Sequence, residues 1–346
     1  MARDPFRNFN QYKIDPLSEV RNAGLVTNGD VYWVSSVADS AHTTRRNDMG
    51  RDVVKETVNQ AITAVTDGNN DYVFIIPTDN GTVIPLGTAI DITKDRVHVL
   101  GIGNNKPAPF GYGGLTFRGY VAATAVDTEL MTVNGAGVEL GGFKLLGTSG
   151  TAAAGTITSH LLIGTTANGT PHDLWVHDVH VESTQAASAN GTTDLVTISG
   201  DVAGGIQGIR FDRCWIGNAL FSSTNGVVNM GGTAGPTRVE FHDTTFLIDS
   251  QATTEKFVSV GTGKTEYTLF DKCMFVNVET GGSNPASAIV GAVLADSIVM
   301  LLDCKYVNVT QAGTDPLAFK APVASGTSTA VRDYGIGVGT AALVPV

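Results

Sequence analysis

The stretch GIRFDRCWIGN, residues 208–218, decides the fold because its pattern occurs six times along the chain. Each copy has an apolar residue, two mostly polar residues and then a small or apolar residue. The other copies are GVELGGFKLLG (137–147), HDLWVHDVHVES (172–183), RVEFHDTTFLID (238–249), YTLFDKCMFVNV (267–278) and IVMLLDCKYVNV (298–309). Their fourth positions form a column made of Phe143, Val179, Cys214, Thr244, Cys273 and Cys304. Repetition at this spacing is typical of a solenoid.

A second apolar run precedes each copy and repeats with a similar period. The markers of these runs are Met131, Leu162, Val196, Val228, Val258, Ile289 and Ala318. Gly, Thr, Ser, Asn and Ala fill the segments between the runs, as turns and loops require. Two short strands per repeat with no helical period between them predict an all-β fold, a parallel β-helix with stacked rungs around one core.

Two polar columns next to the fourth position support this stacking. One column contains Asp178, Arg213, Asp243, Lys272 and Asp303, and the column before it contains His177, Asp212, His242, Asp271 and Leu302. Rungs lie about 4.8 Å apart along the strand-pairing direction. Unlike charges on neighbouring rungs therefore stabilise the stack, and we expect these residues, together with Cys214, Thr244, Cys273 and Cys304, to form structural ladders.

Composition narrows the function classes. The net charge of −11 and the sequence pI near 5.0 argue against a nucleic-acid partner. No run of 18 apolar residues predicts a membrane-spanning helix, and the N-terminus shows no secretory leader. The three cysteines are expected to be buried free thiols, which fits folding in a reducing host cytoplasm.

The chain divides into four parts by pattern. Residues 1–30 read as an extended N-terminal arm, and residues 31–126 as a capping region with the first coils. Within this region, residues 53–66 predict one amphipathic capping helix, with Asp52 as its N-cap and Gly68 just past its end. Residues 127–322 hold the β-helix repeat, and residues 323–346 form a C-terminal tail.

A family resemblance follows from the order of the capping helix, DYVFIIP (71–77), RVHVLGIG (96–103) and ELMTVNGAGVELGGFKLLG (129–147). This order resembles the opening of pectate-lyase-like right-handed β-helix proteins, and in particular short virion proteins of tailed bacteriophages. The resemblance covers residues 31–310. It implies a right-handed coil, but a fold does not carry chemistry with it.

Candidate catalytic residues are Asp212, Asp243, Asp271 and Asp303. Asp212 and Asp271 share a column two rungs apart, about 9.6 Å by the strand spacing, close to the separation used by inverting glycosidases. His242 stands between them and cations flank them, so a charge-compensating ladder is the favoured interpretation over a catalytic pair.

His172, His177 and His180 lack metal-ligand spacing, with His177 and His180 expected on opposite faces of one strand. Trp175 and Trp215 are expected in offset columns, without a shared sugar platform. The sequence predicts no catalytic, metal or cofactor site.

These observations predict a non-enzymatic, structural virion protein. The expected role is a capsid decoration or cement protein on the outer surface of a bacteriophage head, acting as a homotrimer on the major capsid protein. The arm is expected to anchor it through Phe6, Arg7, Phe9 and Tyr12. The alternative is a tailspike-like or receptor-binding β-helix that binds or cleaves host polysaccharide, since the Gly/Thr/Ser/Asn loops are open to glycan binding.

Overall fold

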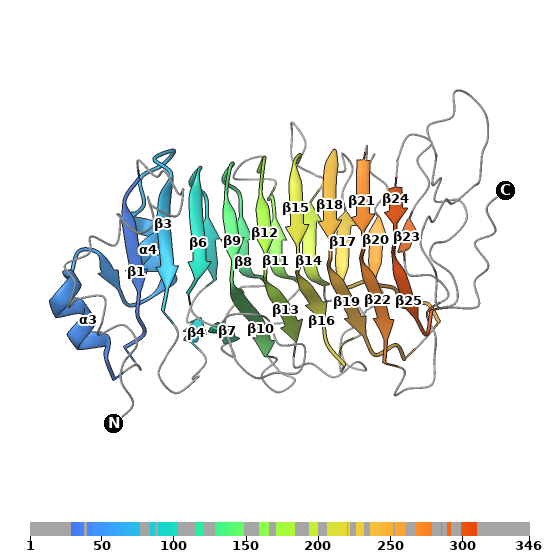
Figure 1. Cartoon of the computed structure of the whole chain (residues 1–346), viewed down its shortest axis with the longest axis horizontal. Helices are drawn as coiled ribbons and strands as arrows, with labels where there is room; N and C mark the ends of the chain where they lie inside the picture. The colour runs from blue at the N-terminus through green and yellow to red at the C-terminus, as the bar shows by residue number, and fades with distance from the viewer. Residues whose placement is uncertain are drawn as a thin grey trace.

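The computed structural model shows a right-handed parallel β-helix, in which strands cross the long axis of the molecule and stack along it (Figure 1). It describes residues 29–37, 40–76, 84–86, 89–102, 115–120, 129–148, 159–165, 171–183, 194–199, 206–219, 221, 226–231, 236–251, 253–260, 267–278, 285, 289–291 and 299–309. The arm residues Phe6, Arg7, Phe9 and Tyr12, and the tail 323–346, lie outside these ranges.

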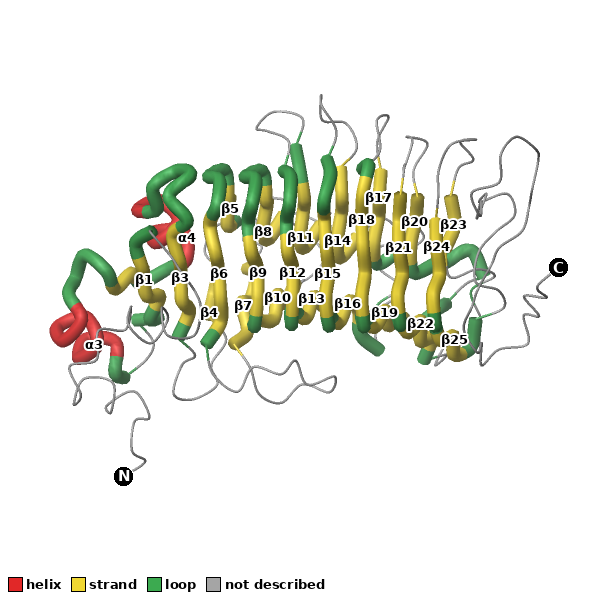
Figure 2. Tube along the Cα trace, turned by 45° about the horizontal axis from the view of Figure 1, so that its top comes forward, coloured by secondary structure: helices red, strands yellow, loops and turns green. Residues whose placement is uncertain are grey.

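Three parallel sheets, A, B and C, run along the molecule (Figure 2). Sheet A contains, in spatial order, β2 (Val54–Lys55), β1 (Val31–Val34), β3 (Asp71–Ile75), β6 (Val97–Gly101), β9 (Glu139–Gly141), β12 (Trp175–His177), β15 (Ile209–Asp212), β18 (Arg238–His242), β21 (Tyr267–Asp271) and β24 (Val299–Leu302). Sheet B contains β4 (Ile84–Leu86), β7 (Leu115–Tyr120), β10 (Phe143–Thr148), β13 (His180–Ser183), β16 (Trp215–Gly217), β19 (Thr245–Ile248), β22 (Met274–Asn277) and β25 (Lys305–Val307). Sheet C contains β5 (Ile90–Ile92), β8 (Glu129–Val133), β11 (Ser159–Ile163), β14 (Asp194–Ser199), β17 (Val228–Gly231), β20 (Val258–Val260) and β23 (Ile289–Gly291).

Each repeat therefore has three strands, where the sequence analysis expected two. The copies of GIRFDRCWIGN contain a sharp bend between a strand of sheet A and a strand of sheet B. A single left-handed residue makes this bend in six successive rungs, with φ between 48° and 72°, at Gly142, Asp178, Arg213, Asp243, Lys272 and Asp303. The predicted charge column that runs from Asp178 to Asp303 is therefore also the column of residues that form the bend.

The backbone ladder continues through the bend, which is why the bend does not interrupt the stack. The amide of Arg213 donates to the carbonyl of His242 at 2.9 Å, and the amide of Asp243 donates to the carbonyl of Asp271 at 2.9 Å. The guanidinium of Arg213 binds the Asp178 carboxylate at 2.6 and 2.9 Å, as the alternating charges predict.

The core is filled by stacks of like residues from successive rungs. The rings of Phe211, Phe241 and Phe270 stack with centroids 4.8 and 5.0 Å apart, and all three side chains are buried. Cys214, Thr244, Cys273 and Cys304 line a neighbouring column of this core, and the cysteines are free and buried, as predicted. Burial raises the pKa of the Cys214 thiol to about 12, so this thiol is unreactive in the folded chain.

The N-terminal end differs from the expectation of one helix over residues 53–66. Two helices are described there, α3 (His42–Met49) and α4 (Val58–Ala64). Val54 and Lys55 pair in register with Trp33 and Val34, so the backbone before residue 58 belongs to sheet A. The N-cap of α4 is accordingly Thr57, whose hydroxyl accepts from the amide of Gln60 at 3.2 Å, and Asp52 does not cap it. Within the described ranges, no helix is long and apolar enough to cross a membrane.

Candidate functional site

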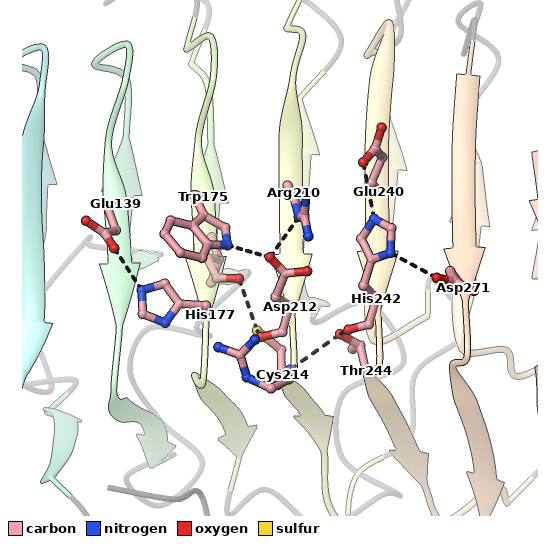
Figure 3. Close-up of polar contacts among 12 residues, drawn as sticks. Glu139, Trp175, His177, Arg210, Asp212, Cys214, Glu240, His242, Thr244 and Asp271 are labelled. Carbon is pink, nitrogen blue, oxygen red and sulfur yellow. Dashed lines mark hydrogen bonds and ion pairs between the residues drawn. The ribbon is translucent and has the colours of Figure 1, made fainter. Parts of the chain in front are cut away.

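The outer face of sheet A carries a group of connected polar side chains (Figure 3). Register pairing arranges its outward residues in two rows along the molecule. The first row contains His98, Glu139, Trp175, Arg210 and Glu240, and the second contains Gly141, His177, Asp212, His242 and Asp271. Side chains distant in sequence are therefore neighbours at the rung spacing, and we call these two rows the sheet A rows.

Trp175 is the exposed aromatic residue of the sheet A rows. Its indole nitrogen donates to Asp212 Oδ2 at 2.5 Å, and Arg210 Nε donates to the same oxygen at 2.7 Å. The Asp212 side chain is only 6% exposed, whereas Trp175 is 41% exposed and the Arg210 side chain 53% exposed. One buried carboxylate therefore fixes an indole and a guanidinium side by side on the surface.

Glu139 is held between two imidazoles on either side of its strand. His98 Nδ1 lies 2.6 Å from Glu139 Oε2, and His177 Nε2 lies 3.0 Å from Glu139 Oε1. Burial alone would raise the pKa of Glu139, but the hydrogen bonds from His177 and His98 outweigh it and lower this pKa to about 2. Glu139 is therefore ionised at any physiological pH.

His177 connects Glu139 to the bend column. Its Nδ1 lies 2.9 Å from Asp178 Oδ2, and its ring contacts Trp175 in a tilted arrangement with centroids 4.3 Å apart. Burial opposes protonation, but the hydrogen bonds to Glu139 and Asp178 prevail and raise the pKa of His177. The ring lies over Gly141, where a Cβ would come within 2.4 Å of it. A side chain at residue 141 would therefore displace the imidazole.

The carboxylates at the other end of the sheet A rows are also paired with cations or imidazoles. Glu240 contacts Arg238 Nε at 2.9 Å and His242 Nε2 at 3.2 Å, and Asp271 lies 3.3 Å from His242 Nδ1. Burial would raise the pKa of Glu240, but the hydrogen bonds from His242 and Arg238 lower it. The rows therefore present fixed, compensated charges, as the ladder interpretation predicts.

The candidate residues from the sequence are only partly brought together. Asp212 and Asp271 do share a column with His242 between them, whereas Asp243 and Asp303 lie in the bend. His177 and His180 do not lie on opposite faces of one strand, because the left-handed bend at Asp178 puts them in sheets A and B. Trp175 and Trp215 likewise lie in different sheets, consistent with the absence of a shared platform.

Glu139, His98 and Gly141 were not singled out by the sequence analysis. These residues become neighbours when RVHVLGIG and GVELGGFKLLG pair in register on sheet A. The sequence alone does not define this register, because it does not show where each strand begins. Within the described ranges, no group of three or more His, Cys, Asp or Glu side chains is arranged to hold a metal ion.

The chain resembles known proteins in its structure and not in its sequence. Neither a protein-family profile nor a curated protein matches this sequence. A solved pectin methylesterase in complex with a hexasaccharide aligns with a TM-score of 0.48 and 11% identity, over 84% of this chain and 81% of that one. The pectin methylesterase from Aspergillus niger, in deglycosylated form, aligns with a TM-score of 0.41 and 9% identity, over 83% of this chain and 68% of that one.

These neighbours correct one prediction. They are enzymes, and by this comparison the prediction that the chain is not an enzyme is wrong. At such identities and TM-scores the likeness transfers no activity, substrate or catalytic residue to this chain. The chain has a β-helix fold that resembles carbohydrate-active proteins.

Proposed function

We propose that this chain binds polysaccharide along the outer face of sheet A. The observation that carries the proposal is the exposed Trp175 indole, held in place by Asp212 and flanked by Arg210. An indole face packs against the apolar face of a sugar ring, and its fixed orientation lowers the entropic cost of binding. Arg210 supplies further hydrogen-bond donors beside it, because only its Nε is used by Asp212.

The compensated rows support the same role. Carboxylates such as Glu139 and Glu240 are acceptors held by half-buried histidines on their own or neighbouring strands, so they meet a ligand without first having to be reoriented. The rows extend over several rungs, which suits an extended chain of sugars more than a single compact ligand. This proposal corresponds to the alternative predicted from the sequence, a β-helix that binds or cleaves polysaccharide. Cleavage of the bound glycan would take place at the same face.

The test is glycan-array binding followed by titration of the best ligand. Trp175→Ala removes the stacking surface, and we expect its dissociation constant to rise roughly tenfold or more, as for aromatic residues that become buried in other binding interfaces. Trp215→Phe, on sheet B, is the matched control and is expected to bind like wild type. Equal affinity of the Trp175→Ala variant would contradict the proposal. Assays of product release from the same glycans show whether binding leads to cleavage.

A second candidate function is the virion role predicted from the sequence. The first described strand, β1, lies near α3 at one end of the stack (Figure 1). An anchor in residues 1–28 would therefore attach the molecule by one end. Met274 in β22 and Val278 just past its end are exposed apolar residues of one rung, and Val307 in β25 is an exposed apolar residue of the next rung, which suits contact between copies of the chain. These features support a homotrimeric decoration protein on a major capsid protein at the outer surface of a phage head.

Deletion of residues 1–28 tests this candidate independently of glycan binding. The truncated chain is expected to keep its fold and its affinity for glycans but to lose binding to isolated phage shells. Met274→Lys is expected to convert trimers to monomers in light scattering. Unchanged shell binding by the truncated chain would exclude the arm as anchor, and a monomeric wild type would exclude the trimer.

A further inference from the structure

The imidazole of His177 lies among three acidic side chains on the outer face of sheet A (Figure 3). In register, its neighbour on β9 is Gly141 and its neighbour on β15 is Asp212. The missing side chain at residue 141 leaves room for the ring, which contacts Glu139 on β9 and Asp178 in the bend. The position of the ring is therefore defined by a glycine below it and by a carboxylate at each of its nitrogens.

The contacts of the two ring nitrogens require a doubly protonated His177. Nδ1 lies 2.9 Å from Asp178 Oδ2, and Nε2 lies 3.0 Å from Glu139 Oε1. A carboxylate only accepts hydrogen bonds and a neutral imidazole has one N–H donor, so both contacts are hydrogen bonds only when the ring carries two protons. Burial would raise the pKa of Asp178, but hydrogen bonds from Arg213 and His177 lower it, so Asp178 is ionised like Glu139. Loss of one ring proton would leave a nitrogen lone pair facing a carboxylate oxygen.

Each of the three carboxylates also has a second, independent partner. The pairs are Glu139 with His98 on β6, Asp178 with Arg213, and Asp212 with Arg210 on β15. Burial opposes the charge on His177, but the hydrogen bonds to Glu139 and Asp178 raise its pKa above the ordinary 6.5. Deprotonation of His177 therefore breaks one of its own bridges and leaves the three other pairs in place.

The imidazole also supports the indole of Trp175, which lies two residues earlier on the same face of β12. The two ring centroids are 4.3 Å apart with an interplanar angle of 35°. Asp212 holds only the Nε1 edge of the indole, so the indole can turn about that hydrogen bond unless a second contact prevents it. A cationic ring against an indole adds an electrostatic attraction to ordinary packing. The protonated imidazole supplies this second contact.

We propose that protonated His177 is a positioning residue, which holds the Trp175 indole in its glycan-binding orientation, so that glycan binding weakens when His177 loses its proton. This inference rests on the proposed binding of polysaccharide to sheet A. A neutral His177 keeps one carboxylate contact and loses the cationic attraction for the indole, which then samples other orientations. The apparent affinity falls with the fraction of molecules in the binding orientation, and we expect a loss of roughly threefold because the Asp212 hydrogen bond remains.

The first measurement is the dissociation constant of the tightest-binding neutral oligosaccharide of the glycan array, from about pH 5.5 to about pH 9. A neutral probe has no group that titrates in this range. Wild type is expected to bind roughly threefold more weakly at the upper end, with a midpoint above pH 6.5. His177→Gln cannot titrate and is expected to give a flat profile. A flat wild-type profile, or an unchanged profile in His177→Gln, would overturn the proposal.

Asp178→Asn tests the assignment of the midpoint. Asparagine tolerates the left-handed conformation of residue 178 but removes one of the two charges that favour the His177 proton. The midpoint of the binding profile is therefore expected to move to lower pH. An unchanged midpoint would show that another group titrates and would overturn the proposal.

His242 provides a matched control for the profile. It also contacts two carboxylates, Glu240 and Asp271, but the residue two positions before it is Glu240 and not a tryptophan. His242→Gln is expected to keep the midpoint and the threefold change of wild type. Loss of the pH dependence in His242→Gln would assign it to that histidine and overturn the role of His177.

A measurement without glycan separates this proposal from the proposed function. The indole N–H resonance of Trp175, identified by its absence in Trp175→Phe, is expected to shift with pH at the binding midpoint in wild type and to stay constant in His177→Gln. Failure of every oligosaccharide to bind would contradict the proposed function, and the indole resonance would then decide by itself whether His177 positions Trp175. A wild-type resonance that does not shift with pH would overturn the positioning role in either case.

Discussion

Glu139 on sheet A and Asp194 on sheet C are carboxylates with little solvent exposure, 14% for the Glu139 side chain and 5% for Asp194. Their pKa values nevertheless move in opposite directions. Burial disfavours the anion at both, but hydrogen bonds from His177 and His98 lower the pKa of Glu139 to about 2, whereas burial raises that of Asp194 to about 7. Burial alone therefore does not decide the protonation state, and the side chains on the neighbouring rungs do.

The solenoid explains why the neighbours differ. On sheet A, the register places an imidazole or guanidinium on a rung next to a carboxylate, as with His98 beside Glu139. At the start of β14, the residue paired with Asp194 on β11 is the uncharged Ser159, and on β17 the neutral Asn229 side chain donates to the Asp194 carboxyl group. A substitution in one column consequently affects the charge balance of the adjacent rungs.

The largest effect is expected for Gly141→Val. A Cβ at residue 141 would lie 2.4 Å from the His177 ring, so the imidazole must leave Glu139 and Trp175. We expect a loss of about 3 kcal/mol in the free energy of unfolding, typical of severe overpacking, measured by urea denaturation.

A double-mutant cycle isolates the cause. His177→Ala removes the ring that a side chain at residue 141 would meet, so Gly141→Val should cost much less in the His177→Ala background. Equal costs in both backgrounds would show that the clash lies elsewhere.

An intermediate effect is expected for Asp194→Asn. The folded-state pKa of Asp194, about 7, lies above its ordinary value of 3.8. The folded chain therefore holds a proton that the unfolded chain has lost, and stability falls as pH rises from about 4 to about 7. Asparagine cannot ionise, so the variant should match the parent near pH 4 and exceed it by at least about 2 kcal/mol at pH 8. Parallel stability profiles would contradict this assignment.

The repeat could be predicted from the sequence because identical chemistry recurs in register. The column of Cys214, Thr244, Cys273 and Cys304 and the alternation of Asp178 with Arg213 both mark the rungs. The third strand of each rung could not be predicted, because a bend made by one charged residue in the left-handed conformation looks like an ordinary polar pair in a strand. For the same reason His177 and His180 were assigned to one strand.

The candidate site was less predictable than the fold. The pairing of Asp212 with Trp175 and Arg210 depends on side-chain directions that become defined only once three strands are in register. Asp194 follows a Gly/Thr segment and resembles a loop residue in the sequence. Its burial arises from the rungs above and below it, and no local pattern encodes that environment.

The smallest effect is expected for Glu139→Gln, which keeps the shape of the side chain and removes its charge. The folded-state pKa of Glu139, about 2, lies below its ordinary value of 4.5, so its contribution is present above about pH 4.5 and lost as pH falls toward 2. The pKa of His177 is raised above 6.5, so the contribution of its protonated form is lost as pH rises through that higher value. The two conditions overlap between about pH 4.5 and 6.5, where the variant should be less stable by about 1 kcal/mol. The difference should shrink on both sides of this window, whereas the Asp194→Asn difference should grow from about pH 4 to about pH 7 and then stay constant. A Glu139→Gln difference that also grew toward pH 8 would mean that His177 is neutral in the folded chain and that Glu139 is stabilised by its hydrogen bonds alone.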